Sequence, residues 1–141
     1  MKEARIIIDS TVEDLDDAGL TESSDKTHAE ALGAVKESDG DITVSYSQTE
    51  EGVTSHSVIT VSADGVKVER HGDAEYSFSF KQGESTSSLY SIPPYSFDTE
   101  IFTRRIRSSL TQGGGDLTLI YDMTIGGAKK KTTMKIKVIE I

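Results

Sequence analysis

Arg70 is the residue of this sequence whose type and position most favour contact with a ligand. It follows Val66 and Val68 at two-residue spacing, and side chains two apart on a strand point to the same side. We therefore expect the Arg70 guanidinium to point inward with the valines. Because a buried arginine must be paired or hydrogen-bonded, it either reaches solvent or a carboxylate such as Asp122, or contacts an anionic ligand at the mouth of a cavity.

Four tyrosines share the spacing of the apolar residues around them. They are Tyr46, Tyr76, Tyr90 and Tyr121. Inward tyrosines belong either to the core, with the hydroxyl bonded to a partner, or to a ligand pocket in which they supply polar contacts. Together with Arg70 they are the candidate ligand-binding residues.

A second candidate site is a group of basic residues in the last third of the chain. The 141 residues include 15 basic and 24 acidic side chains, for a net charge of −9, and the acidic excess lies in the first half. The basic group consists of Arg104, Arg105, Arg107, Lys129, Lys130 and Lys131. Such residues form either a solvated face or a surface that binds a nucleic acid or a protein. We expect them to share one side of the molecule, away from an acidic loop at Glu13–Asp25.

Other patterns that could support catalysis or metal binding fail on spacing. Asp14, Asp16 and Asp25 approach the ligand spacing of an EF-hand loop, but Ala18 stands at a ligand position and no amphipathic helices flank the segment. The three histidines lack the spacing that brings metal ligands together. The chain has no cysteine, which excludes disulfides and thiol nucleophiles. We therefore expect a protein that is not an enzyme and has no cofactor or metal.

The elements that must position these residues are strands. Apolar residues recur at every second position along most of the chain, as in Leu117, Leu119 and Tyr121. Turn residues such as Gly126-Gly127 separate the alternating runs, and Pro93-Pro94 must break the strand before it. We count about ten strands, at the spacing of an all-β sandwich or barrel.

Two segments depart from this alternation. Lys26–Glu37 is rich in helix-forming residues, but Gly33 in its middle favours a bend or bulge in a strand. In residues 97–110 the apolar positions change parity between Thr103 and Ile106. A β-bulge near Arg104-Arg105 would restore a common face, because one extra residue shifts the register by one.

Short residue groups along nearly the whole chain carry a family resemblance. They are Gly33 and Val35; Ile42, Val44, Ser45 and Tyr46; Arg70, His71 and Gly72; Leu89, Tyr90 and Pro93; Thr103; and Gly115, Leu117, Leu119, Tyr121 and Asp122. In order and spacing they resemble the YwiB-like family of small bacterial proteins of unknown function. The sequence departs from that family directly after Pro93.

The resemblance implies one domain over residues 1–141 that forms a single closed antiparallel β-barrel, calycin-like or lipocalin-like, of about eight to ten strands. It favours a strand over a helix at 26–37, and it supplies no established activity. Because an open sheet would leave two long sticky edges, we expect the strand with Ile6 and Ile8 to pair with the strand of Ile136 and Val138.

These observations lead to two hypotheses about function. In the first, the protein is a non-catalytic barrel that binds a small anionic or amphipathic molecule through Arg70 and the four tyrosines. In the second, it is an interaction module that binds RNA or a protein through the six basic residues. The apolar run Ile6–Ile8 near the N-terminus is too short, and its surroundings too charged, for a signal peptide or membrane span. We therefore expect a cytoplasmic protein without membrane contact.

Overall fold

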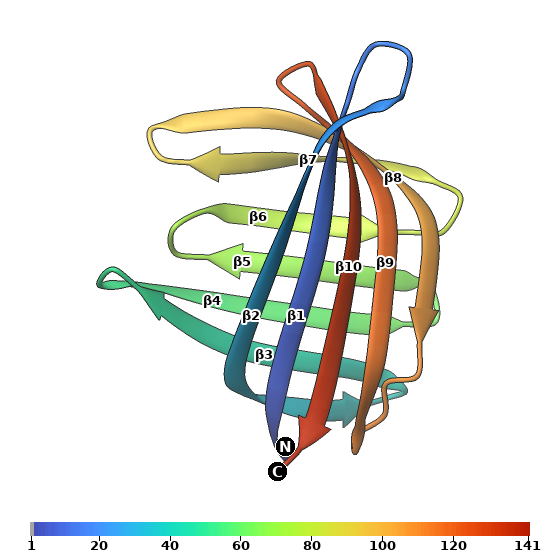
Figure 1. The fold of residues 1–141 in the computed structure, drawn as a ribbon. Coiled ribbons are helices and arrows are strands. Elements are labelled where there is room, and N and C mark those ends of the chain that lie inside the picture. The colour runs from blue at the N-terminus through green and yellow to red at the C-terminus, as the bar shows by residue number, and fades with distance from the viewer. Residues whose placement is uncertain (1) are drawn as a thin grey trace.

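The computed structural model describes residues 2–141, and its elements are ten antiparallel β-strands. They are β1 (Lys2–Leu15), β2 (Thr21–Ser38), β3 (Asp41–Glu50), β4 (Val53–Ser62), β5 (Gly65–His71), β6 (Glu75–Phe80), β7 (Ser85–Ile92), β8 (Tyr95–Ser108), β9 (Gly114–Ile125) and β10 (Ala128–Glu140). Each strand pairs with the next, and β1 pairs with β10 to close a barrel (Figure 1). Among these residues no helix is long and apolar enough to cross a membrane.

The closing pair of strands has the register expected from the sequence. Ile6 lies opposite Val138, and Ile8 lies opposite Ile136. All four side chains follow the inward alternation of their strands, and three of them are buried. The prediction that the first strand pairs with the last is therefore confirmed.

The strands run in two directions in Figure 1, and β2 and β8 each bend from one direction to the other. β2 bends at Gly33, where a Cβ atom would lie 2.1 Å from the Ser45 carbonyl oxygen, so only glycine permits this approach of β3. β8 carries a register shift between Thr103 and Arg105. The strand at 26–37 and the bulge near Arg104 are both confirmed.

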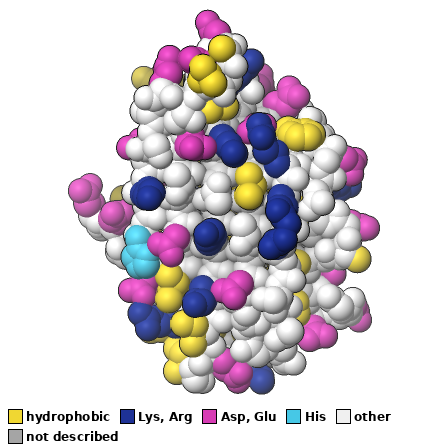
Figure 2. Space-filling model, turned by 45° about the vertical axis from the view of Figure 1, so that its right-hand side comes forward, with side chains coloured by type: hydrophobic (Ala, Val, Ile, Leu, Met, Phe, Trp, Pro, Cys, Tyr) yellow, Lys and Arg dark blue, Asp and Glu magenta, His cyan; other side chains and the backbone are white. Residues whose placement is uncertain are grey.

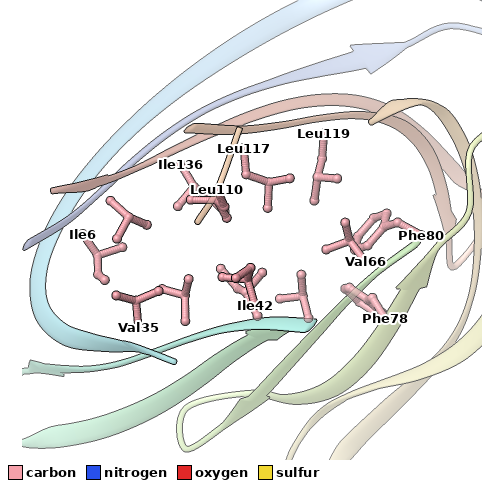
Figure 3. Close-up of a cluster of buried hydrophobic side chains, with 14 of the residues drawn as sticks. Ile6, Val35, Ile42, Val66, Phe78, Phe80, Leu110, Leu117, Leu119 and Ile136 are labelled. Carbon is pink, nitrogen blue, oxygen red and sulfur yellow. The ribbon is translucent and has the colours of Figure 1, made fainter. Parts of the chain in front are cut away.

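The apolar core fills the end of the barrel that contains the chain termini and the loop 109–113. Its fully buried side chains come from strands on all sides of the barrel. The largest are Phe80, Ile6, Ile59, Ile101, Leu117, Leu119, Ile136, Val35 and Val44. Leu110, two residues after the end of β8, packs into the same cluster (Figure 3). We call this half of the interior the closed end.

The acidic segment 13–25 is mostly strand, so the prediction of a loop there is wrong. β1 continues to Leu15 and β2 begins at Thr21, which leaves residues 16–20 as the turn. Strand pairing extends because β10 presents lysines opposite the acidic residues: Asp14 lies opposite Lys130, and their side chains form an ion pair of 2.6 Å. Opposite charges on facing strands stabilise such pairing.

The barrel wall is incomplete in two places. β2 pairs with β3 over Gly33–Ser38, so its first two-thirds, Thr21–Leu32, pair with β1 alone among the described strands. β6 and β7 pair at only two positions, Glu75 with Ser91 and Tyr76 with Tyr90. The turns β3–β4, β5–β6 and β7–β8 project at the end remote from the core (Figure 1). We call this end the mouth.

Candidate functional site

The interior changes from apolar to polar as the strands approach the mouth. On β5 the inward positions run from Val66 and Val68 to Arg70, and on β4 they run from Ile59 to the buried Ser57 and Ser55. Both strands therefore carry the same two-residue alternation through two different environments. The polar residues meet at the mouth.

Arg70 points inward at the mouth, as its spacing predicts, with its side chain 22% exposed. It forms a two-point ion pair with Asp73: Nε donates to Oδ1 at 2.9 Å, and Nη2 donates to Oδ2 at 3.1 Å. The prediction that Asp122 is the carboxylate paired with Arg70 is wrong. Asp122 follows the buried Tyr121, so its side chain lies on the outer face, where it accepts a hydrogen bond of 2.8 Å from Arg104.

Asp73 is held in place by more than Arg70. Its Oδ1 also accepts hydrogen bonds of 2.8 Å from the Ser55 hydroxyl and from the Ala74 backbone N–H. The Arg70 and Ser55 hydrogen bonds lower the pKa of Asp73 to about 2. Asp73 occupies two of the five guanidinium N–H groups, so the ion pair is preorganised and the other donors remain for a ligand.

Three of the four candidate tyrosines surround Arg70. The Arg70 charge acts on Tyr46, Tyr76 and Tyr90 to lower their pKa values, but burial is the stronger effect and raises the pKa of each. Tyr76 stacks on Tyr90, with ring centroids 5.5 Å apart, and on Phe78 at 4.2 Å. The structure therefore brings these tyrosines together with Arg70.

Tyr121 lies deeper than the other three and belongs to the core cluster. Its side chain is buried, its ring centroid is 4.7 Å from that of Phe80, and burial raises its pKa to about 12. It is therefore the candidate tyrosine least accessible to a ligand at the mouth.

A pocket of about 510 Å³ opens beside Arg70 between the β3–β4 and β5–β6 turns. Its polar lining consists of Gln48, Glu50, Glu51, Ser55, Arg70 and Asp73. Three carboxylates thus face one guanidinium, and Asp73 is already paired with it. The pocket is polar, and its net charge is negative.

The opposite side of the mouth carries exposed apolar residues that sequence reasoning missed. Tyr95 and Phe97 share the parity of the buried Thr99, so they lie on the inward side of β8, yet they are 66% and 38% exposed. Ile92 on β7 is 42% exposed and lies opposite Tyr95. Counting back from Thr99 to the Pro93-Pro94 turn would have identified these residues, which we call the apolar lip.

The six basic residues predicted as one site lie on two strands with different environments. Arg104, Arg105 and Arg107 are exposed on β8, whereas Lys130 follows the inward parity of β10 and pairs with Asp14. Lys129 and Lys131 lie opposite Leu15 and Glu13 of β1. The expected separation from the acidic segment is therefore wrong, because closure of the barrel places β10 beside β1.

The histidines do not form a metal centre in the described part of the chain. Among residues 2–141, no group of three or more histidine, aspartate or glutamate side chains is placed to hold a metal ion. His28 instead contacts Asp9 at 2.5 Å, and this hydrogen bond raises the pKa of the exposed histidine.

Comparisons with known proteins agree on the fold. The family described as "Domain of unknown function (DUF1934)" matches residues 12–137. A solved structure, the crystal structure of ywiB protein from Bacillus subtilis, is 20% identical, covers 97% of this chain and 93% of its own, and has a TM-score of 0.73. A search of curated proteins finds no match.

Proposed function

The chain belongs to the DUF1934 family of domains of unknown function, and we propose that it is a non-catalytic barrel that binds a small amphipathic molecule at its mouth. The YwiB-like resemblance and the closed all-β barrel are confirmed. The observation that carries the proposal is the arrangement of the mouth, where a preorganised arginine with tyrosines faces an exposed apolar lip.

Arg70 and its neighbours would bind the polar part of the ligand. The unused guanidinium N–H groups can donate hydrogen bonds, and the hydroxyls of Tyr46, Tyr76 and Tyr90 can donate or accept them. A simple small anion fits less well, because Glu50 and Glu51 line the same pocket and would repel it. We therefore favour the amphipathic ligand over the anionic one.

The apolar lip would bind the other part of the ligand. Ile92, Tyr95 and Phe97 remain exposed although they face inward, and burial of such side chains stabilises a complex by about 25 cal/mol per Å² of apolar surface. Apolar walls with a few well-placed polar groups are the usual composition of small-molecule sites.

Binding rather than catalysis is proposed because these groups do not exchange protons near neutral pH. An arginine stays charged at all physiological pH values, and its ion pair with Asp73 raises the Arg70 pKa further. Burial moves the pKa values of Tyr46, Tyr76 and Tyr90 upward, away from neutrality. General acid–base catalysis needs a group that titrates near the working pH.

A fluorescence titration with 1-anilinonaphthalene-8-sulfonate, an amphipathic probe, tests the proposal. We expect saturable binding by the native protein that is weakened at least about fivefold in Phe97→Ser, which corresponds to about 1 kcal/mol of lost contact. Phe102→Ser is the matched control, since Phe102 is 40% exposed but lies on the outer face of β8. Equal loss in both variants, or no binding by the folded native protein, would contradict the proposal.

A further inference from the structure

Two rows of basic side chains flank strand β9 on the outer face of the barrel. β8 supplies one row and β10 the other: Arg107 lies opposite Thr118, which in turn lies opposite Lys135. The rows are about 10 Å apart, because neighbouring strands are about 4.8 Å apart. The six residues, which we call the basic face, are Arg104, Arg105, Arg107, Lys131, Lys135 and Lys137.

The six cations of the basic face outnumber the carboxylates on the strands beside them. Among residues 2–141, Arg104 is its one member in a salt bridge, with Asp122. The central strand adds a second carboxylate, Asp116, opposite Lys137, and β1 places Asp9 opposite Lys135 and Glu13 opposite Lys131. With six cations beside four carboxylates, this area carries a net positive charge in a chain of net charge −9, and Figure 2 shows dark-blue side chains across this side of the molecule with magenta ones among them.

The strip between the rows is uncharged along its middle, and an aromatic ring on β8 lies beside one end of it. Thr118 and Ile120 are half-buried, and the ring of Phe102 is 40% exposed beside Asp122. Proteins that bind single-stranded nucleic acids combine a basic groove for the phosphates with aromatic rings on which bases stack.

We propose that the basic face binds single-stranded nucleic acid without sequence preference, with phosphates on the two cationic rows and a base stacked on Phe102. A protein partner is less suitable, because Phe102 and Ile120 provide too little apolar surface for the desolvated centre of a stable interface. Neutralisation of phosphates supports nucleic-acid binding by itself. This face lies outside the barrel and does not use the mouth.

Fluorescence anisotropy with a fluorescein-labelled single-stranded oligouridine tests the proposal on the full chain. If all six cations contact phosphates, the slope of log K against log salt concentration is about −4. The double variant Arg105→Gln, Lys135→Gln should bind more weakly, and its salt slope should be shallower by about 1.4. The matched control, Lys36→Gln with Lys67→Gln, removes two exposed lysines from β2 and β5 and should leave both quantities unchanged.

Two single variants separate stacking and local repulsion from overall charge. Phe102→Ser should weaken oligouridine binding about fivefold or more with the salt slope retained, because base stacking contributes about 1–3 kcal/mol. Asp122→Asn should tighten binding, because it removes a carboxylate from the central strand. Phe97→Ser should leave oligouridine binding unchanged. The outcome for the basic face therefore does not depend on whether the mouth binds a ligand.

Three results would overturn the proposal. One is no binding by the folded protein at about 50 mM salt, where electrostatic contacts are strong. The second is equal weakening by the β2–β5 control variant. The third is that oligoglutamate or vesicles of anionic lipid compete as well as unlabelled oligouridine, which would show recognition of any polyanion. Circular dichroism of each variant verifies that the barrel is intact.

Discussion

The two halves of the barrel interior are built on the same strands but filled with different side chains. At the closed end, side chains such as Ile6 and Leu119 are 0% exposed. At the mouth, Arg70 is 22% exposed and its partner Asp73 is 53% exposed. The alternation of β5 runs unbroken from one half into the other, so a two-residue period specifies which face is inward but not how deep a residue lies.

The difference separates stability from the candidate site along each strand. Apolar burial at the closed end supplies the main driving force for folding. The mouth consists of hydrogen-bonded and exposed groups, whose net contribution to folding is smaller. Substitutions in the two halves should therefore differ in how they affect unfolding and binding.

The largest effect is expected at the closed end. Leu119→Ala should lower the free energy of unfolding by about 2–5 kcal/mol, because it removes buried methyl groups and leaves a cavity. Urea unfolding followed by circular dichroism measures the change. Leu32→Ala, at a side chain that is 71% exposed on β2, is the control and should change stability little. A loss below about 1 kcal/mol in Leu119→Ala would contradict a well-packed closed end.

A smaller effect is expected at the mouth. Arg70→Met should lower the free energy of unfolding by only about 1–2 kcal/mol, because the Asp73 carboxylate left behind is half exposed and keeps its bonds to Ser55 and Ala74. The same urea titration tests this, and probe binding should fall in parallel. A cost as large as that of Leu119→Ala would mean that Arg70 belongs to the folding core.

Two buried threonines on β8 provide a matched pair with opposite expectations. Thr99 donates to the Ser88 carbonyl at 2.8 Å, so Thr99→Val should cost about 1 kcal/mol. Within the described residues the Thr103 hydroxyl is buried without a hydrogen-bond partner, so Thr103→Val should be neutral or stabilising by about 1 kcal/mol. Thermal unfolding of both variants decides, and equal destabilisation would show that the Thr103 hydroxyl is satisfied in solution.

The smallest effect is a pH dependence at the mouth. The folded-state pKa of Asp73 is about 2, below its ordinary value of 3.8, so its ion pair stabilises the protein above pH 4 and loses this effect as the pH falls toward 2. The difference in Tm between the native protein and Asp73→Asn should therefore be constant near neutral pH and shrink between pH 4 and pH 2. A constant difference down to pH 2 would show that Arg70 does not hold Asp73 in solution.

Sequence reasoning succeeded where a local pattern determines the structure. The parity change between Thr103 and Ile106 predicts the bulge in β8. Gly33 favours a bend in a strand, and the family resemblance selects a strand over a helix at 26–37. The acidic segment 13–25 could not be read in this way, because its strands depend on lysines of β10 more than a hundred residues later.

At the site, the direction of Arg70 was predictable and its partner was predicted wrongly. Asp122 neighbours the inward Tyr121, so strict alternation already placed it outside. Asp73 lies three residues after Arg70, beyond the end of β5, where alternation stops and the turn returns the carboxylate to the arginine. The apolar lip was missed because alternation predicts that its side chains point inward and are buried. They do point inward, but they lie at the end of their strands beside the turn and are therefore exposed.

The weak pairing of β6 with β7 means that the chain could be connected in a different order. Its two ends are already neighbours: β1 lies beside β10, and the Ile141 N–H donates to the Glu3 carbonyl at 3.2 Å. A circular permutant that joins these ends by a short linker and opens the chain between β6 and β7 would keep every strand neighbour while placing its new termini between two strands that share only two residue pairs. The order of strands around the barrel, rather than the order in which they are synthesised, would then define this fold.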